Sequence, residues 1–177
     1  YHKRLIAFTF WTFNIIHLAM HTVLNDQNPM NSAMIFSQIA DPPEDGFLYT
    51  YEVYGIPLRS RLVVLSSCNT GFGRLSTGEG ILSLARGFLY SGSRSVVMSM
   101  WEVEDKAGTE IVKMFYENLI KGKKKSISLK DARIRYLSKA RQLESHPYFW
   151  STLVVYGDDE PVYNKKCVLW LTVTIPV

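Results

Sequence analysis

Cysteine is scarce in this sequence: its 177 residues include only two, Cys68 and Cys167. So few cysteines exclude the disulfide framework of a small secreted domain, and we expect a reducing, cytoplasmic setting. The sequence also has no cysteine or acidic cluster near His17 and His21, which in an extended strand would lie too far apart to share a metal ion. We therefore expect no metal and no cofactor.

Long uncharged hydrophobic runs are missing too. The apolar stretch Leu5–Met20 contains Asn14 and His17 and is shorter than the roughly 20 residues of a membrane span, so it predicts a strand. The C-terminal stretch 167–177 is uncharged but covers only about half of a span. Two interpretations stay open: an edge strand, or a truncated transmembrane segment flanked on its cytoplasmic side by the lysines at 165–166, which would anchor the protein to a membrane.

Negative charge is nearly absent from residues 121–141. This segment has nine Lys and Arg residues against Asp131 alone, in a chain whose net charge is +4. The solvated face of a helix is the ordinary explanation, and contact with anionic lipid or another acidic partner is the alternative. Because aromatic residues do not interleave with these charges, we expect no nucleic-acid partner.

The remaining composition fits one folded domain, since 47% of the residues are hydrophobic. The sequence begins at Tyr1 without an initiator methionine, so we expect a fragment of a longer chain. Residues 1–162 are expected to form the domain. Residues 163–177 would add a basic flank and an apolar tail.

Apolar runs and helical periodicities alternate along the sequence. This order predicts an α/β fold with a mostly parallel sheet and helices on both faces. Gly92 is a suitable stop for the helix before it, and Ser128 could cap a late helix. The expected strands are 14–19, 33–37, 62–66, 95–100 and 153–156, and the expected helices are 79–90, 106–120 and one beginning near 128.

Two reactive residue types follow buried strands. Cys68 comes after the apolar run 62–65, and His21 after the apolar strand that contains His17. A lone cysteine or histidine is more often structural, but the carboxyl ends of parallel strands share one edge, where ligands bind in α/β sheets. The pattern therefore predicts a thiol–imidazole site with Cys68 and His21, and His17 as the rival histidine.

The glycine-rich segment 71–80 invites comparison with a phosphate-binding loop. Gly73 and Gly78 match the glycines of that motif, but Glu79 and Gly80 stand where Lys and Ser or Thr are required. A carboxylate there would repel phosphate, so we interpret the segment as flexible backbone beside a reactive thiol.

Many short motifs, taken together and in order, resemble one known family. They are 15–21 (IIHLAMH), 28–29 (NP), 64–71 (VLSSCNTG), 78–80 (GEG), 84–88 (LARGF), Gly92, 100–101 (MW) with Val103 and Asp105, and 146–150 (HPYFW). From about residue 10 to about residue 160 the chain looks like a CHAT domain, a caspase-like module often found with tetratricopeptide repeats. The resemblance implies a caspase-like α/β/α sandwich and a clan CD cysteine peptidase.

Carried over by position, the resemblance implies that His21 and Cys68 are the catalytic pair. The backbone amides of Cys68 and Thr22 would bind the oxyanion. The sequence departs from the family at Thr22, because members commonly have glycine after the histidine. If that amide requires a positive φ, threonine is strained there.

The segment 101–105 (WEVED) supplies the candidates for a substrate pocket. Its carboxylates, including Glu102 and above all Asp105, could accept an Arg or Lys side chain, as acidic pockets do in related peptidases that cut after basic residues. The alternative is that Asp105 simply favours the start of the next helix. Trp101 would line the pocket or belong to the core, and we favour the core.

Two functions of different classes follow. The first is a cysteine endopeptidase that acts on a protein or peptide substrate and is regulated by a partner or an upstream repeat region. The second is a catalytically silent, caspase-like interaction or signalling module. The intact pair of His21 and Cys68 favours the first, and Thr22 favours the second.

Overall fold

A central sheet organises the computed structural model, which describes residues 13–36, 45–66, 79–101, 105–163 and 170–174, with backbone alone for Asp105 and 170–174. Its strand order is β7-β6-β5-β1-β8, in which β1, β5, β6 and β8 are parallel and β7 is antiparallel to β6. The predicted mostly parallel sheet is confirmed. Its strands are β1 (Ile15–Ala19), β5 (Leu62–Leu65), β6 (Ser95–Ser99), β7 (Leu153–Gly157) and β8 (Trp170–Thr174).

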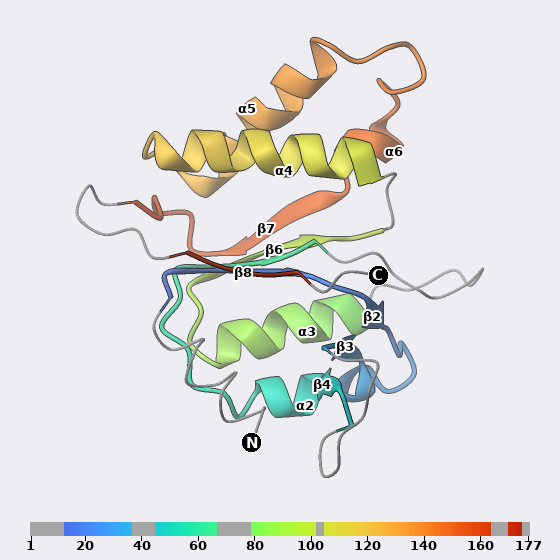
Figure 1. Ribbon diagram of the computed structural model, residues 1–177, viewed down its shortest axis with the longest axis vertical. Helices are drawn as coiled ribbons and strands as arrows, with labels where there is room; N and C mark the ends of the chain where they lie inside the picture. Colours follow the sequence, from blue (N-terminus) through green and yellow to red (C-terminus); the bar gives the residue numbers. More distant parts are fainter. Residues whose placement is uncertain (1–12, 37–44, 67–78, 102–104, 164–169, 175–177) are drawn as a thin grey trace.

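Helices cover both faces of this sheet and complete the expected α/β/α sandwich (Figure 1). On one face lie α3 (Glu79–Tyr90) and the short α2 (Thr50–Val53). On the other lie α4 (Asp105–Ile120), α5 (Lys125–Leu137) and the short α6 (Pro147–Trp150). The predicted boundaries of α3 match the observed ones, and α4 begins one residue before the prediction.

Alternating side chains of the strands build a separate core on each face, as the period of two in a strand requires. In β5, Val63 and Leu65 pack with Phe88 of α3, whereas Leu62 and Val64 pack with Phe115 of α4. A strand buried on both faces is a continuous apolar run in the sequence. This is why β5 could be located before its partners were known.

A second, antiparallel sheet contains the strand that was expected at 33–37. There β3 (Ala33–Ile35) pairs with β2 (Thr22–Val23) and β4 (Phe47–Tyr49), with the 3-10 turn η1 (Pro29–Asn31) before it. The expectation of a further strand in the main sheet was therefore wrong. A short apolar run shows that a strand forms, but not which sheet it joins.

The C-terminal residues Trp170–Thr174 form β8, an edge strand that runs parallel to β1. Within the described ranges, the helices are all too short or too polar to cross a membrane.

The basic segment divides into surface and buried residues. The prediction that Ser128 caps α5 was wrong. The helix begins at Lys125, and Ser128 is buried inside it. Lys125 is itself buried and donates from Nζ to the carbonyl of Asp158 at 2.8 Å, while the guanidinium of Arg133 donates to the carbonyl of Leu153. These two cations therefore bind the backbone at the two ends of β7. They do not belong to the solvated helix face that the sequence suggested.

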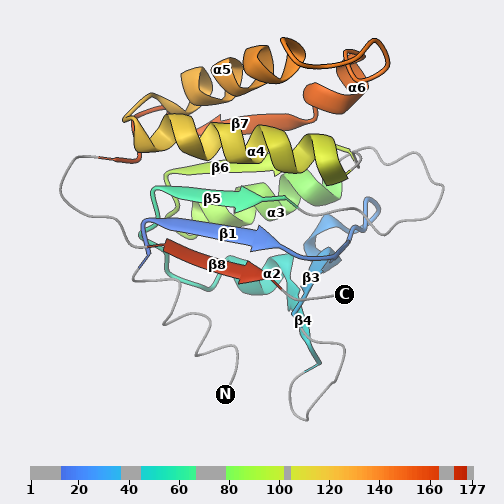
Figure 2. The ribbon, with the colours of Figure 1, turned by 45° about the horizontal axis from the view of Figure 1, so that its top comes forward.

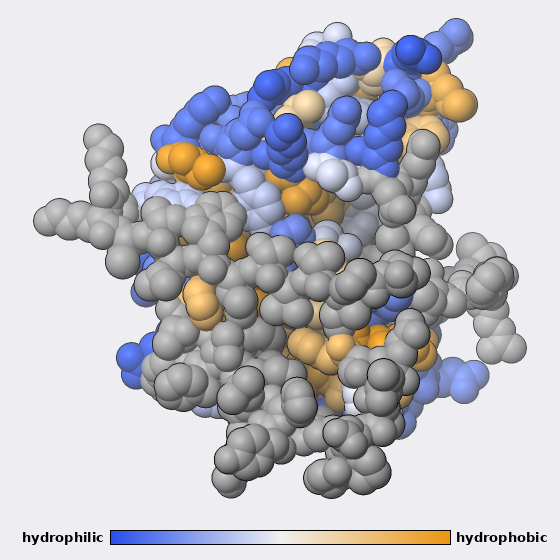
Figure 3. Space-filling model, viewed as in Figure 1, coloured by the Kyte–Doolittle hydropathy of each residue, from blue (hydrophilic) through white to orange (hydrophobic). Residues whose placement is uncertain are grey.

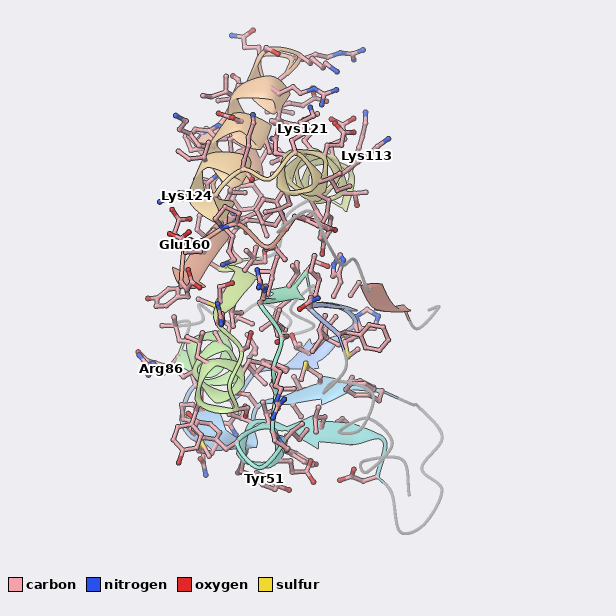
Figure 4. The ribbon with its side chains drawn as sticks, turned by 90° about the vertical axis from the view of Figure 1, so that its left-hand side faces the viewer. Tyr51, Arg86, Lys113, Lys121, Lys124 and Glu160 are labelled. Atoms are coloured by element: carbon pink, nitrogen blue, oxygen red, sulfur yellow. The ribbon has the colours of Figure 1, made fainter. Side chains whose placement is uncertain are left out.

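The other cations of α4, α5 and the turn between them give this end of the molecule its hydrophilic surface (Figure 3). Figure 4 shows Lys113 and Lys121 directed away from the sheet. Lys124 lies 3.7 Å from Glu160, and Lys123 lies 2.7 Å from Asp131. Part of the positive charge is therefore neutralised by neighbouring carboxylates.

Gly92 ends α3 in the way that the sequence predicted. Its φ is +110°, the N–H of Ser93 donates to the carbonyl of Phe88 at 3.0 Å, and that of Gly92 to Leu89 at 3.1 Å. This pair of bonds is the Schellman motif, which requires a residue with positive φ. A Cβ at Gly92 would lie 2.4 Å from the carbonyl oxygen of Leu58.

We predict that Gly92→Ala lowers the free energy of unfolding by at least about 1 kcal/mol, through strain at positive φ and the clash with Leu58. Gly108→Ala is the matched control, because Gly108 lies inside α4 and a Cβ there meets nothing within 4 Å. It should raise the same free energy by about 0.5–1 kcal/mol. Urea unfolding of both variants measures the difference, and equal effects would contradict the explanation.

Candidate functional site

The carboxyl ends of β1 and β5 lie side by side and define the candidate site (Figure 2). The two strands are parallel, and Leu18 is the register partner of Leu65. The N–H of Ser66 continues the ladder by donating to the carbonyl of Leu18 at 3.2 Å. Whatever follows Leu18 and Leu65 in the sequence therefore leaves the sheet at one edge.

His21 lies just beyond the end of β1. Its carbonyl accepts a hydrogen bond of 2.9 Å from the N–H of Ile35, so its backbone is already aligned with the small sheet. Its Nδ1 is buried and makes no hydrogen bond to any other residue of the described part of the chain. A buried polar atom of this kind is costly unless it has a role, such as bonding a group that enters the site.

Cys68 lies outside the described residues, so its expected contact with His21 stays a prediction. The register nevertheless bears on it, since His21 is three residues beyond Leu18 and Cys68 is three residues beyond Leu65. Glu102 lies outside the described residues as well. Of the pocket candidates, Trp101 is described in full and Asp105 by its backbone.

Thr22, the expected oxyanion residue, is buried in β2. The bond from Ile35 to His21 makes His21 and Ile35 the hydrogen-bonded pair of this ladder, so Thr22 and Met34 form the adjacent pair without such bonds. The N–H of Thr22 therefore points away from β3. Among the described residues, those with positive φ are all glycines, so Thr22 does not carry the strain considered above.

His17 does not reach the edge but faces the α4 layer. Its Nε2 lies 2.6 Å from Oγ of Ser66, and its ring centroid lies 5.6 Å from that of Tyr116. Burial lowers the pKa of His17 to about 4, so the ring is neutral at pH 7. The rival histidine thus connects β1 to the end of β5 through a side-chain hydrogen bond. The sequence did not reveal this role, because it depends on Ser66, which is distant from His17 along the chain.

Trp101 is not a core residue, contrary to the expectation. Its side chain is 38% exposed, stacks on Tyr148 with 6.4 Å between ring centroids, and donates from Nε1 to the carbonyl of Tyr148 at 3.0 Å. It follows β6 at the same edge as His21. Asp105 is the first residue of α4, as the helix-start alternative predicted.

The described ranges contain no group of three or more His, Cys, Asp and Glu residues with the proximity needed to hold a metal ion. Of the predicted pair, the imidazole of His21 is the member that the structure describes.

Comparison with known families decides the relationship. The family model for the CHAT domain matches residues 6–158. This chain belongs to the CHAT domain family. The matched range contains β1, β5 and β6 together with His21 and Cys68, so every catalytic and pocket candidate lies within the CHAT domain.

Two relatives of this CHAT domain are long proteins. Tetratricopeptide repeat protein 28 of Mus musculus is 33% identical over 157 residues, which cover 87% of this chain and 6% of the relative. Its Homo sapiens counterpart is 32% identical over 134 residues, which cover 75% of this chain and 5% of the relative. This chain thus spans about one-twentieth of the length of these relatives.

A structural comparison also matched the crystal structure of the Arg-specific cysteine proteinase gingipain R (RgpB). The TM-score is 0.46 at 13% sequence identity, and the match covers 90% of this chain and 35% of the other.

The buried His17 of this CHAT domain predicts a pH dependence of stability. The pKa of His17 falls from 6.5 to about 4 on folding. Between these two pH values His17 is protonated in the unfolded chain but neutral in the folded chain. Stability is therefore full above about pH 6.5 and falls as the pH drops towards 4. We expect the free energy of unfolding to be about 2 kcal/mol lower at pH 5 than at pH 7.5 from this residue alone.

The variant His17→Gln tests this origin, since glutamine does not titrate but keeps a polar group near Ser66. Urea unfolding at the two pH values should show a smaller loss on acidification for the variant than for the unmodified chain. Equal losses would show that His17 is not the responsible group.

Proposed function

We propose that this CHAT domain is a cysteine endopeptidase in which His21 and Cys68 form the catalytic pair. The observation that supports this most is the parallel pairing of β1 with β5, with equal distances along the chain from the register partners Leu18 and Leu65 to the two residues. Two strands in register deliver such residues to one edge of the sheet. The buried Nδ1 of His21, without a partner among the described residues, is a second support.

The chemistry follows from the two side chains. The Cys68 thiolate attacks the carbonyl carbon of the scissile bond and forms a thioester, while the His21 imidazolium gives a proton to the departing amine. Water then attacks the thioester, His21 accepts a proton from it, and the acid product leaves Cys68. The N–H groups of Thr22 and Cys68 are the proposed donors to the oxyanion.

A catalytically silent interaction module is the second candidate. The feature that favours it is the threonine that replaces the glycine expected after the histidine. The extended backbone of Thr22, with its N–H directed away from β3, weakens this argument because the residue carries no strain in that conformation.

Regulation by another part of the protein belongs to the proposal. The relatives are named for tetratricopeptide repeats and are far longer than this chain. We infer that an upstream repeat region, or a partner bound to it, controls access to the site. A reducing, cytoplasmic setting suits a free thiolate nucleophile. Attachment to the cytoplasmic side of a membrane through the tail is less well supported, because 170–174 forms β8.

The catalytic pair can be tested by covalent labelling. A peptidyl acyloxymethyl ketone with arginine next to the reactive group should label Cys68 in the full-length protein, and His21→Ala should slow labelling by about 100-fold or more because the general acid–base is lost. Cys167→Ser is the matched control and should label normally. Mass spectrometry of the adduct identifies the site. Labelling at Cys167 instead, or labelling indifferent to His21, would remove the peptidase proposal.

The acidic pocket is the finer part of the proposal and rests on Asp105. Asp105→Asn keeps the size of the side chain but removes its charge, so cleavage of peptides with Arg before the scissile bond should fall by about 10–100-fold in kcat/KM. Glu110→Gln, an exposed residue of the same helix, is the control and should change nothing. Equal rates for Arg-containing and Met-containing peptides in the unmodified enzyme would contradict an acidic pocket.

A further inference from the structure

Exposed apolar side chains lie at the carboxyl edge, where Trp101 stacks on Tyr148 and Leu143 lines the same hollow as Tyr148. Leu143 is 76% exposed and Tyr148 is 48% exposed, although both are large and apolar in most of their surface. Phe149 packs edge-on against Tyr148 with 5.5 Å between ring centroids. We call Trp101, Leu143, Tyr148 and Phe149 the aromatic shelf. Single exposed apolar residues are ordinary, but a contiguous group marks a contact surface.

The aromatic shelf is held in place by the strands beneath it. The carbonyl of Trp101 accepts hydrogen bonds of 2.8 Å from Oγ of Ser99 and 2.8 Å from Oγ1 of Thr152. The indole N–H donates to the carbonyl of Tyr148, so the carbonyl and the indole N–H of Trp101 both have partners within the protein. A ring fixed in this way keeps its apolar surface available and loses little freedom when a ligand covers it.

Beside this shelf lies an open hollow of about 710 Å³. Its described lining contains neither a carboxylate nor a Lys or Arg side chain. The chemistry of the hollow therefore suits an aliphatic or aromatic group rather than a charged one. The lining residues are Gln142, Leu143, His146, Tyr148 and Phe149.

The position of the shelf relates it to the catalytic edge. Trp101 follows β6, and α6 leads into β7, whose Leu153 pairs with Ser99 at the end of β6. Figure 2 shows α6 at the end of the sheet towards which β1 and β5 point. Neighbouring strands lie about 4.8 Å apart, so β7 is about 10 Å from β5 within the sheet, and α6 lies beside the end of β7 in the helix layer that contains α4 (Figure 1). An extended peptide spans about 10 Å in about three residues, so one bound polypeptide of a few residues can reach both places.

We propose that the aromatic shelf binds an aliphatic or aromatic side chain of the polypeptide substrate, a few residues from the scissile bond. The inference rests on the proposed peptidase function for its biological meaning, but it concerns peptide binding and not the thiol chemistry. The substrate class is thus a polypeptide with an apolar residue at a fixed distance from the cleavage point.

Binding can be measured without turnover. The full-length protein with Cys68→Ala is applied to a peptide array in which each position carries Leu, Phe, Ser or Glu in turn. We expect peptides with Leu or Phe at one position to be retained about tenfold better than those with Ser or Glu. Removing Leu143 or Tyr148 from the shelf by substitution to serine should reduce that preference by a similar factor, as loss of a buried apolar contact does.

Matched controls separate the shelf from general effects on folding. Leu143 and Ile134 are both exposed aliphatic residues, at 76% and 58%, but Ile134 lies on α5 outside the shelf. Ile134→Ser should leave the array preference unchanged, and so should Tyr90→Ser, which removes an exposed aromatic residue of α3. Circular dichroism melting of all four variants should agree within a few degrees.

The outcomes distinguish this inference from the peptidase proposal. A preference for Leu or Phe that disappears in Leu143→Ser and Tyr148→Ser supports the shelf, even if the protein with its Cys68 intact cleaves none of the retained peptides. In that case the peptidase proposal fails and the shelf remains a peptide-binding site. No positional preference, or a preference that both shelf variants retain, overturns the inference, even where Cys68-dependent cleavage is observed.

Discussion

Parallel pairing between β1 and β5 is the constraint on which the rest of the structure depends. The pairing sets His17 beside Val64 and Leu18 beside Leu65, so the chain leaves both strands at matching heights. It also makes β5 the centre of the sheet, buried by α3 on one side and α4 on the other. A slip of one residue would turn the apolar side chains of β1 to the wrong layers and separate the two strand ends.

The cationic residues illustrate how one sequence feature can serve two physical purposes. Lys125 and Arg133 are desolvated, which lowers the pKa of both, and their hydrogen bonds to backbone carbonyls offset part of that cost. The exposed cations around them remain in water, where ion pairs such as Lys124 with Glu160 contribute little to stability. Their value lies in solubility and in the charge that they present to partners.

Elements with strong local signals could be predicted from the sequence. The helix α3 combines an amphipathic period with Gly92 at its end, and β5 is an uninterrupted apolar run, so both were located correctly. The strands β2 and β4 are too short for a period to show.

Features that depend on distant residues could not be predicted. The start of α5 was placed at Ser128 instead of Lys125, because the burial of Lys125 depends on Asp158, which is distant in the sequence. Likewise, α6 holds Trp101 at the surface, and no pattern near Trp101 indicates that contact. The position of His21 at the sheet edge could be predicted, because His21 follows an apolar strand. The partner of His17 could not, because Ser66 is distant from it in the sequence.

The backbone around His21 belongs to two sheets at once. The strand before it, β1, belongs to the large, mostly parallel sheet, while the carbonyl of His21 accepts a hydrogen bond from Ile35 of the small antiparallel one. The backbone of His21 is therefore fixed from two directions, by its covalent link to β1 and by its hydrogen bond to β3, so a shift of the small sheet relative to the large one would carry His21 with it.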